Sequence, residues 1–332
     1  MDNGEQYPRP DAASKRWLRL LMAGLGWRVS ISRMSARAVV LCYHSVHPTA
    51  SFRSATPKLF SQHLLWLKQH CTVVHFQHAV RAAEQPPGGR PVAAITFDDG
   101  FADNYEYAFP LLHQHGLPAT FFLTVGLLEK NPIVLERLRD LWGAQAEEIR
   151  PLTWSAVREM RRAGMEMGAH TYSHPNLAQL DRRAAELEAR RPKEIIEDRL
   201  GEPVRIMAYP FGKPKSHFTK ETIEVVSGAG YEYAAAVTWR GIHPSDSHFR
   251  IPRFTCTGDS ICTLRDKVSG AWDLLGAWQE RAPVGTRRPA KGTPPWWRDV
   301  VSDLQPVERM TDGDATHVSN SDAKACAVPW RT

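Results

Sequence analysis

The sequence has few of the features that mark secreted proteins. The chain of 332 residues holds five cysteines, and no two of them form a Cys-x-x-Cys pair. An odd number of cysteines without such pairs argues against a disulfide framework and against a thiolate zinc site. We therefore predict reduced, mostly structural thiols and a cytoplasmic protein.

Long hydrophobic runs are also missing. The first apolar stretch, residues 17–27, is interrupted by Arg19 and is not followed by a signal-peptidase pattern. It is too short to span a bilayer. Flanking basic residues leave two interpretations of an N-terminal extension over residues 1–36: an amphipathic helix packed on the domain, or one lying on a membrane surface. We accordingly predict a protein that is cytoplasmic or peripheral to the membrane.

Clustered positive charge is the third feature that the chain lacks. Its net charge is +6 and its pI is near 9.1, but the basic residues are scattered and form no run with aromatic residues. This distribution speaks against a nucleic-acid partner. Hydrophobic residues make up 42% of the chain and charged residues 23%, which is typical of a soluble globular protein. Nothing in the sequence indicates an oligomeric state.

Strand-like and helix-like segments alternate from about Ala38 onward. Such alternation favours a parallel sheet or an α/β barrel. Pro110 and Pro192 are expected to interrupt or kink the helices that contain them. The predicted strands are residues 39–43, 73–76, 92–97, 119–125, 165–169, 204–209 and 231–237, and the predicted helices are 58–70, 104–115, 153–163, 182–200 and 220–227.

The pattern changes after about Gly276. Residues 283–295 are rich in proline, arginine and glycine, and no sustained apolar period follows them. We therefore expect a catalytic domain over residues 37–276 and a poorly ordered C-terminal tail over residues 277–332.

Two adjacent carboxylates follow the most apolar predicted strand, in Thr96-Phe97-Asp98-Asp99-Gly100. The carboxyl ends of parallel strands face the ligand in α/β proteins, and two buried carboxylates there need a cation or a proton. The same letters also suit an ordinary turn, because Asp and Gly are common turn residues. By itself the motif fits a turn and a site equally well.

Two histidines four residues apart, His170 and His174, follow another predicted strand. Pro175 argues that they lie on a loop rather than on a helix. Together with Asp99 they would offer one oxygen and two nitrogen ligands, and would leave open positions for water and substrate. Zn²⁺ suits this donor set, and Co²⁺ or Ni²⁺ remain alternatives.

These two motifs resemble the polysaccharide deacetylases of the nodulation-protein-B type, also called carbohydrate esterase family four. The resemblance runs from about Val39 to Leu275. It implies an irregular (β/α)7 barrel, in which Asp98 is the general base. It further implies that Asp99, His170 and His174 bind the metal.

The third family motif departs here from its commonest form. The stretch Tyr209-Pro210-Phe211 resembles the branch that includes biofilm poly-N-acetylglucosamine deacetylases. The resemblance implies that a peptide N–H near Phe211 helps to hold an oxyanion. The arginine that normally orients the base is missing from this motif. Either Arg250 or Arg253 could replace it, or both could make surface or structural ion pairs.

The family's late Leu-x-His motif, which normally supplies the general acid, is also missing. After Phe254 the only histidine is His317, in the predicted tail. The biofilm branch instead carries an early acid histidine, which His44 matches in Leu41-Cys42-Tyr43-His44. A histidine suits this role because its ordinary pKa lies near neutrality. The alternative for His44 is a core or capping side chain.

The sequence therefore predicts a metal-dependent hydrolase that removes N-acetyl groups from a polysaccharide or sugar. Two other functions remain open. One is deacetylation of a lipid-linked sugar, which the basic, apolar N-terminal stretch favours, or of a small amide. The other is a non-catalytic sugar-binding relative, against which the intact set of Asp98, Asp99, His170 and His174 argues. The expected partner in all cases is an N-acetylated glycan or glycolipid, or a similar amide.

Overall fold

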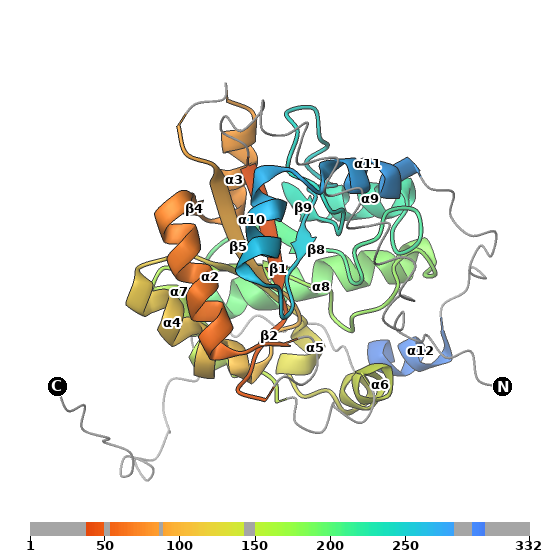
Figure 1. Cartoon of the computed structure of the whole chain (residues 1–332). Helices are drawn as coiled ribbons and strands as arrows, with labels where there is room; N and C mark the ends of the chain where they lie inside the picture. Colours follow the sequence, from red (N-terminus) through yellow and green to blue (C-terminus); the bar gives the residue numbers. More distant parts are fainter. Residues whose placement is uncertain (1–37, 50–53, 86–88, 143–149, 282–293, 303–332) are drawn as a thin grey trace, which may run out of the picture.

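The computed structural model describes residues 38–49, 54–85, 89–142, 150–281 and 294–302 (Figure 1). The predicted amphipathic extension over residues 1–36 lies outside these ranges. Among the described helices, none combines the length and the apolar character needed to cross a membrane.

A curled parallel sheet forms the centre of the molecule (Figure 1). Its strands follow the order β10-β1-β5-β6-β7-β8-β9, and every neighbouring pair is parallel. An isolated parallel bridge between Ala235 and Ile251 joins β9 to the segment that leads into β10. The predicted α/β barrel is thus confirmed. The strands are β1 (Ala38–Tyr43), β5 (Val92–Phe97), β6 (Thr120–Leu123), β7 (Glu166–Ala169), β8 (Ile206–Ala208), β9 (Tyr233–Ala235) and β10 (Phe254–Thr255).

Helices surround this sheet and alternate with its strands (Figure 1). The cap predicted for α7 is present: the Thr153 hydroxyl accepts a hydrogen bond from the Ala156 N–H at the start of the helix. The helices are α2 (Pro57–His70), α3 (Phe76–Ala83), α4 (Phe109–His115), α5 (Val125–Leu128), α6 (Pro132–Trp142), α7 (Trp154–Arg162), α8 (Arg182–Leu200), α9 (Lys220–Gly228), α10 (Ile261–Ser269) and α11 (Asp273–Arg281). Three short strands complete this part of the fold: β2 (Ser45–Val46), β3 (Ser54–Ala55) and β4 (Thr72–Val74).

The interior of the barrel changes from apolar to polar along the strands. Val40, Ala94 and Phe122 belong to one buried apolar cluster, which side chains of α3 join. Because strand side chains alternate between the two faces, Cys42 and His44 continue the face of Val40, and Asp98 continues that of Ala94. The apolar residues fill one end of the interior, and Cys42, His44 and Asp98 lie at the carboxyl end of the strands.

Three features of the helices differ from the sequence prediction or refine it. Helix α8 continues through Pro192, so the predicted break there is wrong. At Pro110 the interruption is confirmed: a π-helical turn over Asn104–Ala108 precedes α4, and the Phe109 N–H donates to the Asn104 carbonyl. Residues 76–83 form helix α3, although the sequence predicted only a strand ending at Phe76.

The predicted C-terminal tail also differs from the structure. Helix α11 crosses the expected boundary at residue 276, and helix α12 (Pro295–Ser302) follows within the tail. Trp297 and Val300 of α12 are buried, and α12 packs against α6. The expectation of poor order is therefore wrong for residues 294–302, and residues 282–293 and 303–332 lie outside the described part of the chain.

Candidate metal and catalytic site

The predicted site residues meet at the carboxyl end of the sheet. His44 follows β1, Asp98 follows β5, His170 follows β7 and Tyr209 follows β8. The Asp98 N–H donates to the Tyr43 carbonyl at 3.0 Å, which continues the β1–β5 ladder into the site. These side chains line a cavity of about 500 Å³, a volume typical of small-ligand sites.

The backbone around this cavity is held in left-handed conformations. Asp99 has φ 74°, Thr171 65°, His174 56° and Phe211 59°, and these are four of the six non-glycine residues with positive φ in the described ranges. Each such residue costs on the order of 1–3 kcal/mol. Strain of this kind persists only where surrounding contacts impose it, so its concentration here supports a functional site.

Asp99, His170 and His174 form a compact cluster. The Asp99 Oδ1 atom lies 3.4 Å from the Nε2 atom of each histidine, and the potential ligand atoms all lie within 4.8 Å of one another. All three residues are buried, and Asp99 Oδ1 accepts no hydrogen bond. A buried carboxylate oxygen without a donor, facing two imidazole nitrogens, is well suited to a divalent metal of the zinc type. The predicted ligand set therefore fits a metal.

Hydrogen bonds outside the cluster fix the orientation of its histidines. The Nδ1 atom of His170 lies 2.8 Å from the Ala208 carbonyl oxygen. In the tautomer that donates this bond, Nε2 carries a lone pair toward Asp99. The backbone N–H of His174 donates to the Thr171 hydroxyl at 3.0 Å, which closes the tight turn between the two histidines.

Asp98 has a different partner. The Arg253 guanidinium donates to Oδ1 at 2.7 Å and to Oδ2 at 2.8 Å, and Arg253 is fully buried. Burial alone would raise the pKa of Asp98, but the charge and hydrogen bonds of Arg253 outweigh it and lower the pKa to about 2. Of the two predicted arginine candidates, the structure brings Arg253 to the carboxylate.

Arg250 does not reach the site. Its side chain is 42% exposed, and its nearest ion-pair partner is Glu280 at 3.9 Å. The suggestion that Arg250 orients the base is therefore wrong. Along the chain Arg250 and Arg253 are close neighbours, but only Arg253 points into the barrel.

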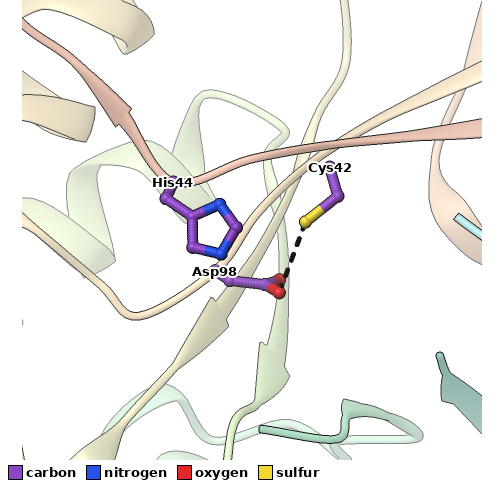
Figure 2. Close-up of side chains that lie close together, drawn as sticks. All are labelled: Cys42, His44 and Asp98. Atoms are coloured by element: carbon purple, nitrogen blue, oxygen red, sulfur yellow. Dashed lines mark hydrogen bonds between the residues drawn. The ribbon is translucent and has the colours of Figure 1, made fainter. Parts of the chain in front are cut away.

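Cys42, His44 and Asp98 lie close together (Figure 2), and Asp98 Oδ2 is 4.0 Å from His170 Nε2 of the neighbouring cluster. Their potential ligand atoms are also within 4.8 Å of one another, and the Cys42 Sγ–H donates to Asp98 Oδ2 at 3.4 Å. Both oxygens of Asp98 are already bound by Arg253, whose positive charge opposes a second cation. This trio is suited to proton transfer rather than to metal binding.

Cys42 was missed as a site residue because the sequence indicated only buried structural thiols. Burial raises its pKa well above the ordinary thiol value, with Asp98 adding to the effect, so it is a neutral donor to the carboxylate. Its position two residues before His44 on one strand was the available signal, since such residues share a face.

The third motif forms one wall of the cavity. The Tyr209 hydroxyl donates to the Phe249 carbonyl at 3.1 Å, and its ring stacks on Phe218 with centroids 3.9 Å apart. Pro210 is buried, and the Phe211 ring packs against His174 with centroids 4.9 Å apart. The motif therefore packs against His174 as well as lining the cavity.

Comparison with known proteins assigns this arrangement to a family. Residues 85–234 match the family model described as polysaccharide deacetylase. The matched range contains Asp98, Asp99, His170 and His174 as well as the third motif. The chain carries a polysaccharide deacetylase domain. The resemblance predicted from the motifs is thus confirmed, and the domain belongs to a family of deacetylase hydrolases.

Two curated relatives share this deacetylase domain. The Bacillus subtilis (strain 168) protein YxkH, named after the same family, is 25% identical over 199 residues, which cover 59% of this chain and 63% of YxkH. The chain thus spans somewhat less than two thirds of that relative. The poly-beta-1,6-N-acetyl-D-glucosamine N-deacetylase of Staphylococcus aureus (strain MRSA252) is 22% identical over 230 residues, covering 65% of this chain and 72% of that protein.

Solved structures show the same fold as the deacetylase domain. IcaB from Ammonifex degensii superposes with a TM-score of 0.55 at 25% identity, over 74% of this chain and 98% of that one. The Streptococcus pyogenes deacetylase PplD, solved in complex with acetate, superposes with a TM-score of 0.59 at 21% identity, over 71% and 99%. The irregular barrel is therefore the fold of these deacetylases.

Proposed function

We propose that the protein is a metal-dependent carbohydrate N-deacetylase that removes acetyl groups from an N-acetylated polysaccharide. The observation that carries the proposal is a pair of adjacent aspartates with different partners in one cavity. Asp98 is bound by Arg253, and Asp99 faces His170 and His174. Such a site offers a base and a metal-ligand set next to each other, which is the arrangement that metal-assisted amide hydrolysis uses.

Asp99, His170 and His174 would hold the metal, and Zn²⁺ is the proposed ion, with Co²⁺ and Ni²⁺ as alternatives. When bound, the metal would polarise the acetyl carbonyl and increase the acidity of the attacking water. The oxygen-and-two-nitrogen donor set leaves positions open for both.

Asp98 is the proposed general base. Its pKa of about 2 keeps it ionised at neutral pH, and Arg253 holds its carboxylate in one orientation. It accepts a proton from the water that attacks the acetyl carbonyl carbon. Cys42 supplies a further hydrogen bond that keeps the carboxylate in place.

His44 is the proposed general acid. It lies at the cavity wall beside Asp98, so both can reach one substrate amide from the same side of the barrel (Figure 2). As the tetrahedral adduct collapses, the C–N bond breaks and His44 gives a proton to the leaving nitrogen. The products are acetate and a free amino sugar. A peptide N–H near Phe211 is proposed to stabilise the developing oxyanion.

The proposed substrate is a polymer of N-acetylglucosamine. The Staphylococcus aureus relative, named a poly-beta-1,6-N-acetyl-D-glucosamine N-deacetylase, supports this choice. Aromatic side chains of Trp239 and Trp272 line the cavity beyond the catalytic groups, as sugar rings require for stacking.

The test is acetate release by metal-free and Zn²⁺-loaded protein. Oligomers of β-1,6-linked N-acetylglucosamine, chito-oligosaccharides, an N-acetylated glycolipid and a small acetamide would be compared at equal amide concentration. We expect Zn²⁺-dependent acetate release, fastest with the β-1,6-linked oligomers. Faster release from the glycolipid or the acetamide would replace the proposed substrate, and binding of oligomers without any acetate release would replace the proposed enzyme with a sugar-binding protein.

We further propose that the protein is cytoplasmic or peripheral to the membrane, with residues 1–36 as the membrane-binding segment. Fractionation of cells producing the full chain and a chain that begins at residue 37 tests this. Recovery of the full chain in the membrane fraction, with the shortened chain in the soluble fraction, would support membrane binding by the extension. Equal distributions of the two chains would rule out that role.

A further inference from the structure

The loop that carries both histidines, residues 170–174, rests on a buried carboxylate. Glu188 of α8 accepts hydrogen bonds at Oε2 from the N–H groups of Tyr172 and Ser173, both at 2.9 Å. Its Oε1 atom accepts the Ser173 hydroxyl at 2.5 Å. Glu188 is only 2% exposed and lies outside the proposed catalytic set. Its hydrogen bonds therefore fix the backbone between the two histidines.

The C-terminal helix supplies a further donor to this carboxylate. The indole N–H of Trp297 in α12 donates to Glu188 Oε1 at 2.9 Å, across 109 positions of sequence. Trp297 is itself buried. A buried carboxylate needs several donors to remain in place, and Trp297 provides the donor that comes from outside the barrel.

A second connection runs from α12 to the same loop. Arg137 of α6 donates to the Ser173 carbonyl at 2.5 Å and to the His174 carbonyl at 3.0 Å. The Trp296 ring lies against its guanidinium, 4.1 Å from the ring centroid, in a cation–π contact. Neighbouring tryptophans of one helix thus act on one loop through two different side chains.

We propose that α12 positions the metal ligands: Trp297 through Glu188, and Trp296 through Arg137, hold the loop of residues 170–174 in its binding conformation. This inference rests on the proposed metal-dependent function. The loop needs such support because Thr171 and His174 both have left-handed backbone conformations, which unsupported residues leave. Outer contacts of this kind typically change metal affinity 10–100-fold when removed.

The alternative is that α12 only covers apolar surface on α6. Trp297→Phe separates the two roles, because phenylalanine keeps a buried aromatic ring but cannot donate a hydrogen bond to Glu188. Trp154→Phe is the matched control. The half-buried Trp154 donates its indole N–H to the Glu129 carboxylate at 2.5 Å, so the control loses the same type of bond at a site that does not support the loop through Glu188.

The experiment measures Zn²⁺ and Co²⁺ dissociation constants of the full chain by competition with a chromophoric chelator. We expect roughly tenfold weaker binding for Trp297→Phe, a larger loss for Glu188→Gln, and wild-type binding for Trp154→Phe. Arg137→Lys, which keeps the charge but loses the fork to two carbonyls, should weaken binding as well. Melting temperatures of the metal-free proteins are recorded in parallel.

Equal metal affinity in Trp297→Phe and wild type would overturn the inference, even if the variant melts at a lower temperature, because a covering role affects only stability. That result would leave the proposed function intact, provided that wild type binds one metal and His174→Ala does not. A wild-type protein that binds no metal would instead overturn the proposed function together with the inference.

Discussion

Asp98 and Asp99 are adjacent in the chain and equally buried, yet their surroundings differ in kind. The Arg253 guanidinium donates one hydrogen bond to each oxygen of Asp98. Asp99 instead has one oxygen 3.4 Å from two imidazole nitrogens and accepts no hydrogen bond there. The first carboxylate already has its cation, and the second is arranged to receive one.

This difference explains how two identical side chains can take two roles. A buried carboxylate must be compensated, and the source of the compensation decides its chemistry. A permanent guanidinium keeps Asp98 ionised, as the proposed role of proton acceptor requires. Asp99 faces two imidazole side chains instead, which suits the ligand role proposed for it. The left-handed conformation of Asp99, φ 74°, separates the two carboxylates so that neighbours along the chain serve adjacent clusters.

The strongest test of the comparison exchanges each aspartate for asparagine. We expect Asp98→Asn to lose turnover by roughly 10²–10⁴-fold while it keeps its metal, because only the base is removed. Asp99→Asn should lose both metal and turnover. Metal content by elemental analysis and acetate release on the same preparations give the answer. If the two variants lost metal equally, the division of roles between Asp98 and Asp99 would be wrong.

Removing the cation from Asp98 should have the next largest effect. In Arg253→Met the carboxylate stays buried without its partner, and we expect a loss of about 3–5 kcal/mol in the free energy of unfolding. Urea denaturation of the metal-free protein measures it. Arg253→Lys, which keeps a charge but not the two parallel hydrogen bonds, is the control and should lose less. Equal losses in the two variants would indicate that the fork geometry is unimportant.

His44 tests the acid side of the same trio. We expect His44→Gln to lower the rate of acetate release by about 10²-fold with metal content unchanged, since only proton donation to the leaving amine is lost. The defect should be smaller for a substrate with a better leaving group, such as an N-acetylated aromatic amine or an acetate ester. A defect of the same size for all leaving groups would move the acid role to another residue.

The smallest expected effect is on stability and concerns Asp103, a third aspartate of the same segment. Asp103 accepts hydrogen bonds from the Ser45 hydroxyl and, at 2.8 Å, from the Asn104 side-chain amide rather than from a guanidinium. Burial raises its pKa to about 6 despite these hydrogen bonds. Because the folded-state pKa exceeds the unfolded value, its contribution to stability is present below about pH 4 and is lost as the pH rises through 6.

Asp103→Asn should therefore match wild type near pH 4 and exceed its stability by about 2 kcal/mol near pH 7. Urea denaturation at both pH values measures the difference. Asp140→Asn, at an exposed position of α6, is the control and should show the same stability difference at both pH values. A pH-independent effect of Asp103→Asn would mean that Asp103 is not held with a raised pKa.

Local patterns were enough for much of the fold. Strands β1, β5 and β7, helix α2 and the Thr153 cap all lie within a residue or two of their predicted positions, because hydrophobic periodicity and capping are local properties. Helix α3 was missed because its sequence, Phe76–Ala83, follows a β-branched pair without an N-cap side chain. Pro192 did not break α8, since the packing of a long helix on the sheet outweighs one lost hydrogen bond.

The candidate site, like the fold, could be predicted from the sequence only in part. By itself the sequence determined which residues end the strands, and so placed Asp98, Asp99, His170 and His174 at one edge of a barrel together with His44. Three contacts became visible only in the folded chain: Arg253 rather than Arg250 binds Asp98, Cys42 donates to Asp98, and Trp297 of the C-terminal region donates to Glu188. Strand ends follow from short-range pattern, whereas the hydrogen bonds to the buried carboxylates join residues that are 155 and 109 positions apart, as in Asp98–Arg253 and Glu188–Trp297. Contacts at such separations are selected by the packing of the whole barrel, and no local pattern encodes them.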